Sequence, residues 1–419
     1  MTIAHPEPNP VVLLPFAILL LTIATAPVFL REWWHKYHPT ICAGFAAVTT
    51  SYYLFRLGAS SRVLHAGMEY GSFMIVVGAF FVVAAGIHLE LRGQATAAFN
   101  TAFLLTGALL GNVLGTVGAS MLLIRPWIAL NRNRFRQYHI AFFIFVISNI
   151  GGALLPIGPP LLLGYVKGVP FWWVLQRCWL PWSVMLGAVL LAFYLFDRVG
   201  QSRRTAGTPP TGRKLRCAGG SNFVVMGAIL VCLIALPGGW RELAIALLAV
   251  AAYWIGSPEI RLRNEFTFAP LKEIAWIFLG IFGTMIPVLE YMERHASDLG
   301  LHSDVQFYWA TGALSALLDN APAYLTLFAG ALGLHGLSLD DAQQISEFLE
   351  KYGRSLVAIS LGATSFGALT YIGNGPNLLV KAIAEHANVP TPSFFGYVIK
   401  FALPVLVPVF LLVSLIFLR

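Results

Sequence analysis

Charged residues are scarce in this sequence. Asp, Glu, Lys and Arg make up 11% of the 419 residues, whereas a soluble globular domain carries about 25%. Hydrophobic residues make up 58%, and the mean hydropathy is +0.74. This composition excludes an ordinary soluble domain and predicts an integral membrane protein with several spans. The net charge of +8 does not indicate nucleic-acid binding, because the basic residues concentrate in short loops, where they set membrane topology.

Motifs for catalysis and for metal binding are also missing. The sequence has no HExxH motif and no GxxxxGK[ST] phosphate loop, which disfavours a metalloenzyme and a primary pump. The first ten residues lack the basic region of a cleavable signal, so we expect the first apolar run to stay in the membrane. We predict neither an enzyme nor a bound cofactor. The four cysteines show no CxxC or Cys/His spacing and are expected to be packing residues: Cys42, Cys178, Cys217 and Cys232.

Long apolar runs separated by short loops are what the sequence has in abundance. They predict an all-α polytopic membrane protein with about ten transmembrane helices, since a span needs roughly 20 apolar residues. The predicted spans lie near 11–30, 41–57, 70–91, 138–165, 171–196, 222–238, 241–256, 272–290, 353–388 and 394–418.

Two further apolar stretches, 99–124 and 307–333, are predicted to be re-entrant hairpins. Each has polar or helix-breaking residues at its midpoint, Gly111-Asn112 in the first and Asp319-Asn320 in the second. Backbone that is not helical is tolerated at membrane depth only where protein or water surrounds it, as at a hairpin tip.

The distribution of charge supports this arrangement. If both stretches re-enter, one side of the membrane receives loops that hold 17 basic and 6 acidic residues, and the positive-inside rule makes that side cytoplasmic. The N-terminus and the acidic segment 334–352 then lie outside. We expect the membrane to be a bacterial inner membrane. The loops on the cytoplasmic side are 31–40, 92–98, 125–137, 197–221, 257–273 and 381–393.

The sequence also divides into two similar halves. The Gly-, Pro- and Arg-rich segment 197–221 is predicted to be a cytoplasmic linker between residues 1–196 and 222–419. Each half has five spans and one hairpin, and because five is odd the second half must be inverted. Each half also has a long segment that is interrupted by Ile-Gly and Pro, at 138–165 and 353–388. Inverted repeats with broken helices place a substrate site at the midplane of the membrane.

Asp319 is the strongest single functional candidate. It is the acidic residue that falls in the middle of an apolar stretch, where an ionisable group is expensive and usually functional. A carboxylate in a dry pocket can exchange a bound proton for a cation, which is the core of an antiporter. Hard cations prefer oxygen ligands. The expected ligands come from both halves: Asp319, Asn320, Thr364, Ser365, Thr370, Asn374 and Asn377 in the second, and Asn112, Thr116, Ser148 and Asn149 in the first. The only metal ion that we expect the protein to bind is sodium, at Asp319.

These motifs resemble the ion-transporter superfamily, in particular the NhaD-type sodium:proton antiporters and their citrate-transporter-like relatives. The resemblance extends from about residue 70 to the end and rests on Asn112–Ser120 with Arg125-Pro126, Ser148–Gly152, Leu318–Pro322 and Gly373–Asn377. It implies two inverted repeats, sodium sites at the hairpin tips and broken-helix loops, and a homodimer. Transported sodium or protons are the expected ions.

One departure from that pattern leaves the substrate open. Similar antiporter-like sequences read Gly-Asp-Pro-Pro at the first break, whereas this chain has Gly158-Pro159-Pro160 without the Asp. Our first hypothesis is a sodium or lithium:proton antiporter with Asp319 as the coupling carboxylate. The alternative is an anion transporter for citrate, a dicarboxylate or an arsenite-like substrate, held by exposed helix N-termini. His88, His139 and His386 lie near predicted span ends and are expected to be interfacial.

Overall fold

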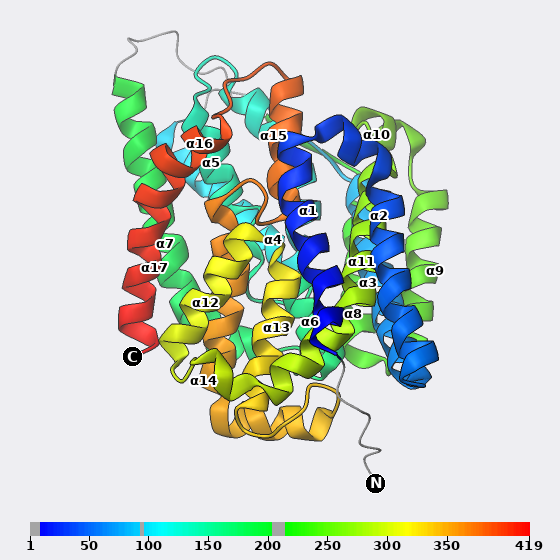
Figure 1. Ribbon diagram of the computed structural model, residues 1–419. Coiled ribbons are helices and arrows are strands. Elements are labelled where there is room, and N and C mark those ends of the chain that lie inside the picture. The colour runs from blue at the N-terminus through cyan, green and yellow to red at the C-terminus, as the bar shows by residue number, and fades with distance from the viewer. Residues whose placement is uncertain (1–8, 93–95, 203–213) are drawn as a thin grey trace.

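The computed structural model is almost entirely helical, and it describes residues 9–92, 96–202 and 214–419. Most helices run between two opposite ends of the molecule (Figure 1). The first half contains α1 (Leu14–Phe29), α2 (Arg31–Ser51), α3 (Ser60–Ala85), α4 (Ala97–Asn131), α5 (Gln137–Val146), α6 (Pro159–Lys167) and α7 (Trp173–Ser202). The second contains α8 (Ser221–Ala235), α9 (Trp240–Ile255), α10 (Pro258–Arg263), α11 (Ala269–Arg294), α12 (Asp304–Leu317), α13 (Asn320–Gly333), α14 (Ala342–Phe366), α15 (Gly375–His386), α16 (Phe394–Tyr397) and α17 (Leu403–Phe417).

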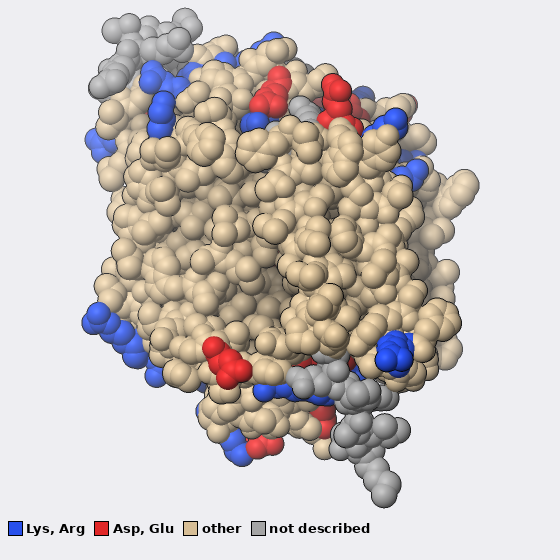
Figure 2. Space-filling model, in the orientation of Figure 1, with Lys and Arg blue, Asp and Glu red and all other residues tan. Residues whose placement is uncertain are grey.

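Within the described part of the chain, six helical segments are long and apolar enough to cross a membrane. An integral membrane protein is therefore supported, while the expected total of ten crossings stays a prediction. Figure 2 shows that Lys, Arg, Asp and Glu gather at two opposite ends of the face in view, with an uncharged belt between them. We call the end with α10 the basic end and the end with residues 334–352 the acidic end (Figure 1).

Segment α4 is a hairpin and not a straight helix. At Gly115 the backbone takes φ 70° and ψ 159°, which favours glycine. Asn100 donates a hydrogen bond to Asn131 at 2.8 Å, and the rings of Phe103 and Trp127 stack with centroids 5.2 Å apart. In a straight helix, residues 100 and 131 would lie about 46 Å apart. The two arms of α4 therefore lie side by side.

The second hairpin consists of α12 and α13, which pack against each other. The helix is interrupted at Leu318 and Asp319, whose ψ angles of 170° and 144° are those of extended backbone. Two further helices are interrupted as well. Irregular chain separates α5 from α6, and α14 from α15, with a single 3-10 turn inside each interruption. We call these interruptions the first and second break.

Several sequence-based expectations were wrong in detail. The structure fits the expected all-α membrane protein, but it adds one short antiparallel two-stranded sheet, in which β1 (His88–Arg92) pairs with β2 (Lys214–Ala218). The predicted span 70–91 therefore ends at Ala85, and part of the predicted linker 197–221 is a strand. Its central residues, 203–213, lie outside the described residues. The apolar and polar alternation of His-Leu-Glu-Leu-Arg is a strand signal that only five residues carry.

Candidate functional site

The tip of the second hairpin holds the carboxylate that the sequence singled out. Asp319 is half-buried and caps α13, with its Oδ1 accepting a hydrogen bond from the Ala321 N–H at 3.1 Å. The neighbouring Asn320 is buried, and its Oδ1 has no hydrogen-bond partner among the described residues. A buried amide oxygen without a donor is unusual in a folded protein. The tip therefore offers one negative charge and one free oxygen side by side in the sequence.

The tip of the first hairpin is neutral. Asn112 is buried, and its Oδ1 accepts a hydrogen bond from the Leu154 N–H at 2.8 Å, which attaches the hairpin to the first break. Thr116 is also buried, and in the described part of the chain its hydroxyl finds no partner. A Cβ on Gly152 would lie 2.4 Å from Thr116 Cγ2, so the close approach of this tip to the break needs glycine there.

The two breaks are joined by three asparagines. Asn149 of the first break donates a hydrogen bond to Asn377 Oδ1 at 2.8 Å and accepts one from Asn374 at 3.1 Å. Asn374 also donates to the Ser148 carbonyl at 2.7 Å, and Asn377 donates to the carbonyls of Gly367 and Thr370. Carbonyls that the broken helices leave free are thus satisfied by amides from both halves of the chain, since Asn149 also donates to the Ile144 carbonyl at 2.8 Å.

The second break is fastened to the second hairpin in turn. The Thr370 hydroxyl donates to the Ala316 carbonyl at 2.6 Å, and the Ser315 hydroxyl donates to the Ala363 carbonyl at 2.7 Å. A Cβ on Gly373 would lie 2.8 Å from the Ser315 carbonyl oxygen. Direct contacts therefore run from the first tip through both breaks to the second tip.

Two of the expected ligands are used differently. The hydroxyls of Thr364 and Ser365 donate to carbonyls of their own helix, those of Ser360 and Leu361. Hydrogen bonds of this local kind satisfy the hydroxyl without bringing it to a shared site. Ser148 is buried and pairs with Ser120, a residue that the sequence reasoning missed.

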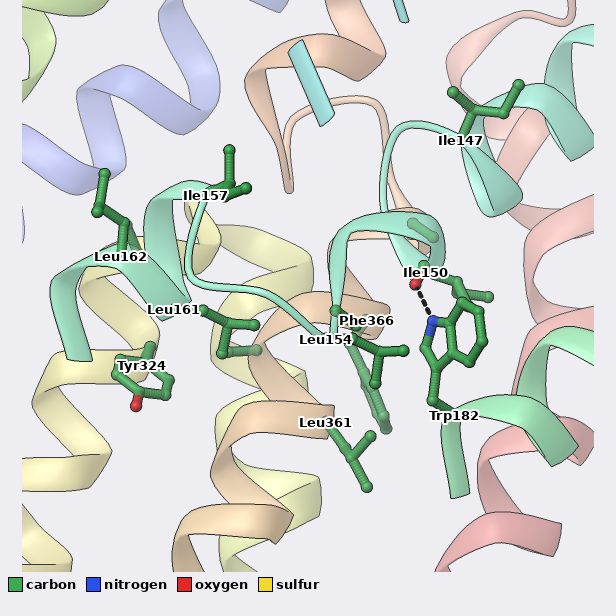
Figure 3. Close-up of a cluster of buried hydrophobic side chains, with 14 of the residues drawn as sticks. Ile147, Ile150, Leu154, Ile157, Leu161, Leu162, Trp182, Tyr324, Leu361 and Phe366 are labelled. Atoms are coloured by element: carbon green, nitrogen blue, oxygen red, sulfur yellow. Dashed lines mark hydrogen bonds between the residues drawn. The ribbon is translucent and has the colours of Figure 1, made fainter. Parts of the chain in front are cut away.

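Apolar side chains seal the first break. Figure 3 shows Leu154 and Ile157 in the loop between α5 and α6, with Leu361 and Phe366 of α14 nearby. Trp182 of α7 donates its indole N–H to the Ile150 carbonyl at 2.6 Å, so another free carbonyl of the break is satisfied. An aromatic residue inside a predicted span gave no signal for this role.

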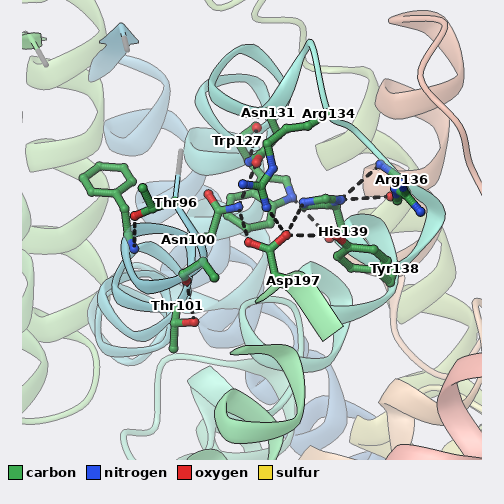
Figure 4. Close-up of polar contacts among 12 residues, drawn as sticks. Thr96, Asn100, Thr101, Trp127, Asn131, Arg134, Arg136, Tyr138, His139 and Asp197 are labelled. Atoms are coloured by element: carbon green, nitrogen blue, oxygen red, sulfur yellow. Dashed lines mark hydrogen bonds and ion pairs between the residues drawn. The ribbon is translucent and has the colours of Figure 1, made fainter. Parts of the chain in front are cut away.

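A second polar cluster lies at the basic end, which the sequence predicts to face the cytoplasm (Figure 4). Asp197 is fully buried in α7 and forms an ion pair with Arg134, with hydrogen bonds from Tyr138 at 2.9 Å and Asn100 at 3.0 Å. His139 Nε2 lies 3.3 Å from Asp197 Oδ1, and the His139 side chain is fully buried. The expectation that His139 is interfacial was therefore wrong. The cluster ties the base of the first hairpin to α5 and α7.

The electrostatics of the centre follow from its composition. The tips and breaks comprise segments 107–120, 147–158, 315–322 and 366–377, and Asp319 is the only Asp, Glu, Lys, Arg or His in them. Both α6 and α15 begin directly after a break, so their N-terminal ends carry partial positive charge toward it, although Pro159, Pro160 and Pro376 contribute no N–H. The centre thus combines neutral oxygen and amide groups, two helix N-termini and one carboxylate.

Apolar helices, two hairpins and two broken helices joined at a polar centre define an integral membrane transport protein. A comparison with protein families agrees: the family described as "Putative citrate transport" matches residues 7–418. The chain belongs to this family, which is one of the ion-transporter superfamily that its motifs resemble. No curated protein matches the chain.

Proposed function

We propose that the protein is a secondary active transporter that exchanges sodium or lithium for protons by alternating access, with Asp319 as the coupling carboxylate. The observation that carries the proposal is the isolation of Asp319. It is the only side chain of the tips and breaks that carries a charge at neutral pH, and it lies at an interruption of the helix.

The charge balance of such a centre supports exchange. An unpaired carboxylate in a water-poor environment is costly, and either a cation or a proton removes the cost. The two cannot neutralise the same carboxylate at once, so binding of one displaces the other. The oxygens of Asn320 and Thr116, which have no partner among the residues that the structure describes, are further candidate ligands for a hard cation.

The packing of the two halves supports alternating access. Helix α13 of the second hairpin packs against α6, and α15 packs against the first hairpin, α4. Each hairpin thus contacts the broken helix of the other half, the pattern that two inverted repeats around a common site would produce. Movement of one hairpin and its partner helix would then change which side of the membrane reaches Asp319.

The family description favours a second candidate, transport of citrate or another carboxylate. The N-termini of α6 and α15 could hold carboxylate groups. Asp319 would repel such an anion, and the tips and breaks contain no Lys or Arg to hold it. This candidate therefore requires a cation that binds together with the anion.

Transport into proteoliposomes that contain a pH-sensitive dye separates the two candidates. The antiporter predicts that an inward sodium or lithium gradient makes the lumen more alkaline, with or without citrate, because protons leave as the cation enters. Proton flux that occurs only when citrate or a dicarboxylate is added would refute the antiporter and establish the second candidate.

A further inference from the structure

A cavity of about 270 Å³ opens near the acidic end, between α3, α6, α11 and the loop before α14. Its lining is unusually rich in charge for a membrane protein. Four carboxylates and three basic side chains line it together with apolar residues of α11: Glu69, Glu290, Glu293 and Asp340, and Arg62, His65 and Lys167. None of these residues belongs to the tips and breaks.

Lys167 lines one side of this cavity. Its side chain is 5% exposed, and its Nζ lies 2.8 Å from Glu69 Oε1 and 2.9 Å from Asp340 Oδ1. These contacts join three separate elements, because Lys167 ends α6, Glu69 belongs to α3 and Asp340 lies in the loop before α14. Buried ion pairs add little net stability compared with apolar packing, so their contribution to stability does not account for this arrangement.

Helix α6 connects this ion pair to the proposed cation site. It begins at Pro159, directly after the first break, and ends eight residues later at Lys167. At its middle, Gly164 lies so close to α13 that a Cβ would be 2.3 Å from the Tyr324 hydroxyl oxygen. Figure 3 shows Tyr324 beside the turn that carries Leu161 and Leu162. Because α13 begins at the Asp319 cap, a shift of α13 would move α6 and thereby Lys167.

We propose that Lys167, Glu69 and Asp340 form a gate at the acidic end, which holds the outer end of α6 closed and opens when α6 moves with α13. The proposal rests on the alternating access of the proposed function but not on the identity of the ion. In the closed state the Lys167 ammonium takes the place of a cation between the two carboxylates.

The rate at which a cysteine in the cavity is labelled tests the gate. Met285 lines the cavity and is 2% exposed. Met285→Cys, in a chain with the exposed Cys217 replaced by Ser, is treated in intact cells with a membrane-impermeant maleimide. Adding Lys167→Met should raise the labelling rate by roughly tenfold, because a buried pair is lost. Labelling at the unchanged rate would overturn the gate.

Two neighbouring aspartates provide a milder variant with a matched control. Asp340→Asn leaves Lys167 one carboxylate and should raise labelling by about threefold, since the Asp340 side chain is 55% exposed. Asp341→Asn changes the next residue, which caps α14 and has no contact with Lys167 among those the structure describes, and should leave the rate unchanged. Equal rates in these two variants would contradict the gate even if Lys167→Met does not fold.

Zinc provides a test in the opposite direction. Ligand atoms of His65, Glu69 and Asp340 all lie within 4.8 Å of one another, and such groups bind Zn²⁺. In the Lys167→Met variant, Zn²⁺ should take the place of the ammonium, slow labelling again, and lose this effect when Asp340→Asn is added. A fast-labelling Lys167→Met variant that Zn²⁺ does not slow would show that these groups do not meet across the gate.

Loss of the gate and loss of the transport site give different results. The labelling rate depends on the mouth of the cavity whatever ion is carried, whereas ion-driven proton flux depends on Asp319. If the wild-type protein showed the expected labelling rates but no ion-driven exchange, that result would count against the proposed function alone.

Discussion

At the scale of single residues, the candidate site is a set of amides and hydroxyls around one carboxylate. The sequence predicted Asn149, Asn374 and Asn377 from their position beside Gly and Pro in apolar segments. It could not predict that they bond to one another across the two halves, because Asn149 and Asn377 are 228 residues apart. The side-chain oxygen of Asn320 accepts no hydrogen bond from the described residues, and this likewise depends on three-dimensional packing that no local pattern encodes.

Asn149→Ala should destabilise the protein by about 1–3 kcal/mol, because it leaves buried partners on Asn374 and Asn377 without hydrogen bonds. Thermal unfolding in detergent, followed by tryptophan fluorescence, measures the effect. Thr106→Ala is a suitable control, since this hydroxyl bonds only to its own helix at an exposed position. Equal melting temperatures for the two variants would mean that the asparagines do not join the halves.

At the scale of elements, interruptions in apolar segments were the most informative signal. Asn112 with nearby glycines, and Asp319 with Asn320 and Pro322, placed both chain reversals within a few residues. Boundaries were less accurate: α3 begins at Ser60, ten residues before the predicted span, because its first turns carry the charged side chains Arg62, His65 and Glu69. Those side chains are paired in the folded protein, which the hydropathy of a local window cannot show.

Gly115→Ala should cost about 1–3 kcal/mol, because φ 70° with ψ 159° is strained for a residue with a Cβ. The same change at Gly71 is a matched control, since it lies within α3 and a Cβ there meets nothing within 4 Å. The free energy of unfolding, measured by thermal unfolding, should fall for the first variant and stay within about 1 kcal/mol of wild type, or rise, for the second. A stable Gly115→Ala protein would argue against the reversal of α4 at this residue.

At the scale of the whole molecule, charge asymmetry gives the orientation that the sequence predicts. The uncharged belt in Figure 2 separates two charged ends. The excess of basic residues in the loops at the basic end comes from the sequence, and by the positive-inside rule it predicts that this end faces the cytoplasm. Composition was sufficient to predict a helical membrane protein. The ion pairs of Asp197 and Lys167 were not foreseen, because each joins elements that only the tertiary fold brings together.

The native Cys217 tests this orientation without a mutation. It is exposed in β2 at the basic end, whereas Cys42 and Cys178 are buried. An impermeant maleimide should therefore leave intact cells unlabelled at Cys217 and react after the membrane is permeabilised. A cysteine placed at Gln343, near the acidic end, should react in intact cells. Labelling of Cys217 in intact cells would show that the basic end faces outward, opposite to the predicted topology.

Exchange by the Asp319→Asn variant is the most direct test of the central claim that this carboxylate couples cation and proton movement. Asn keeps the shape and the capping ability of Asp319 but can neither carry charge nor exchange a proton. In proteoliposomes with an internal pH dye, the folded variant should show no sodium- or lithium-driven proton flux, while Asp298→Asn, at an exposed position, should behave as wild type. Wild-type exchange by a well-folded Asp319→Asn protein would contradict the account and place the coupling elsewhere.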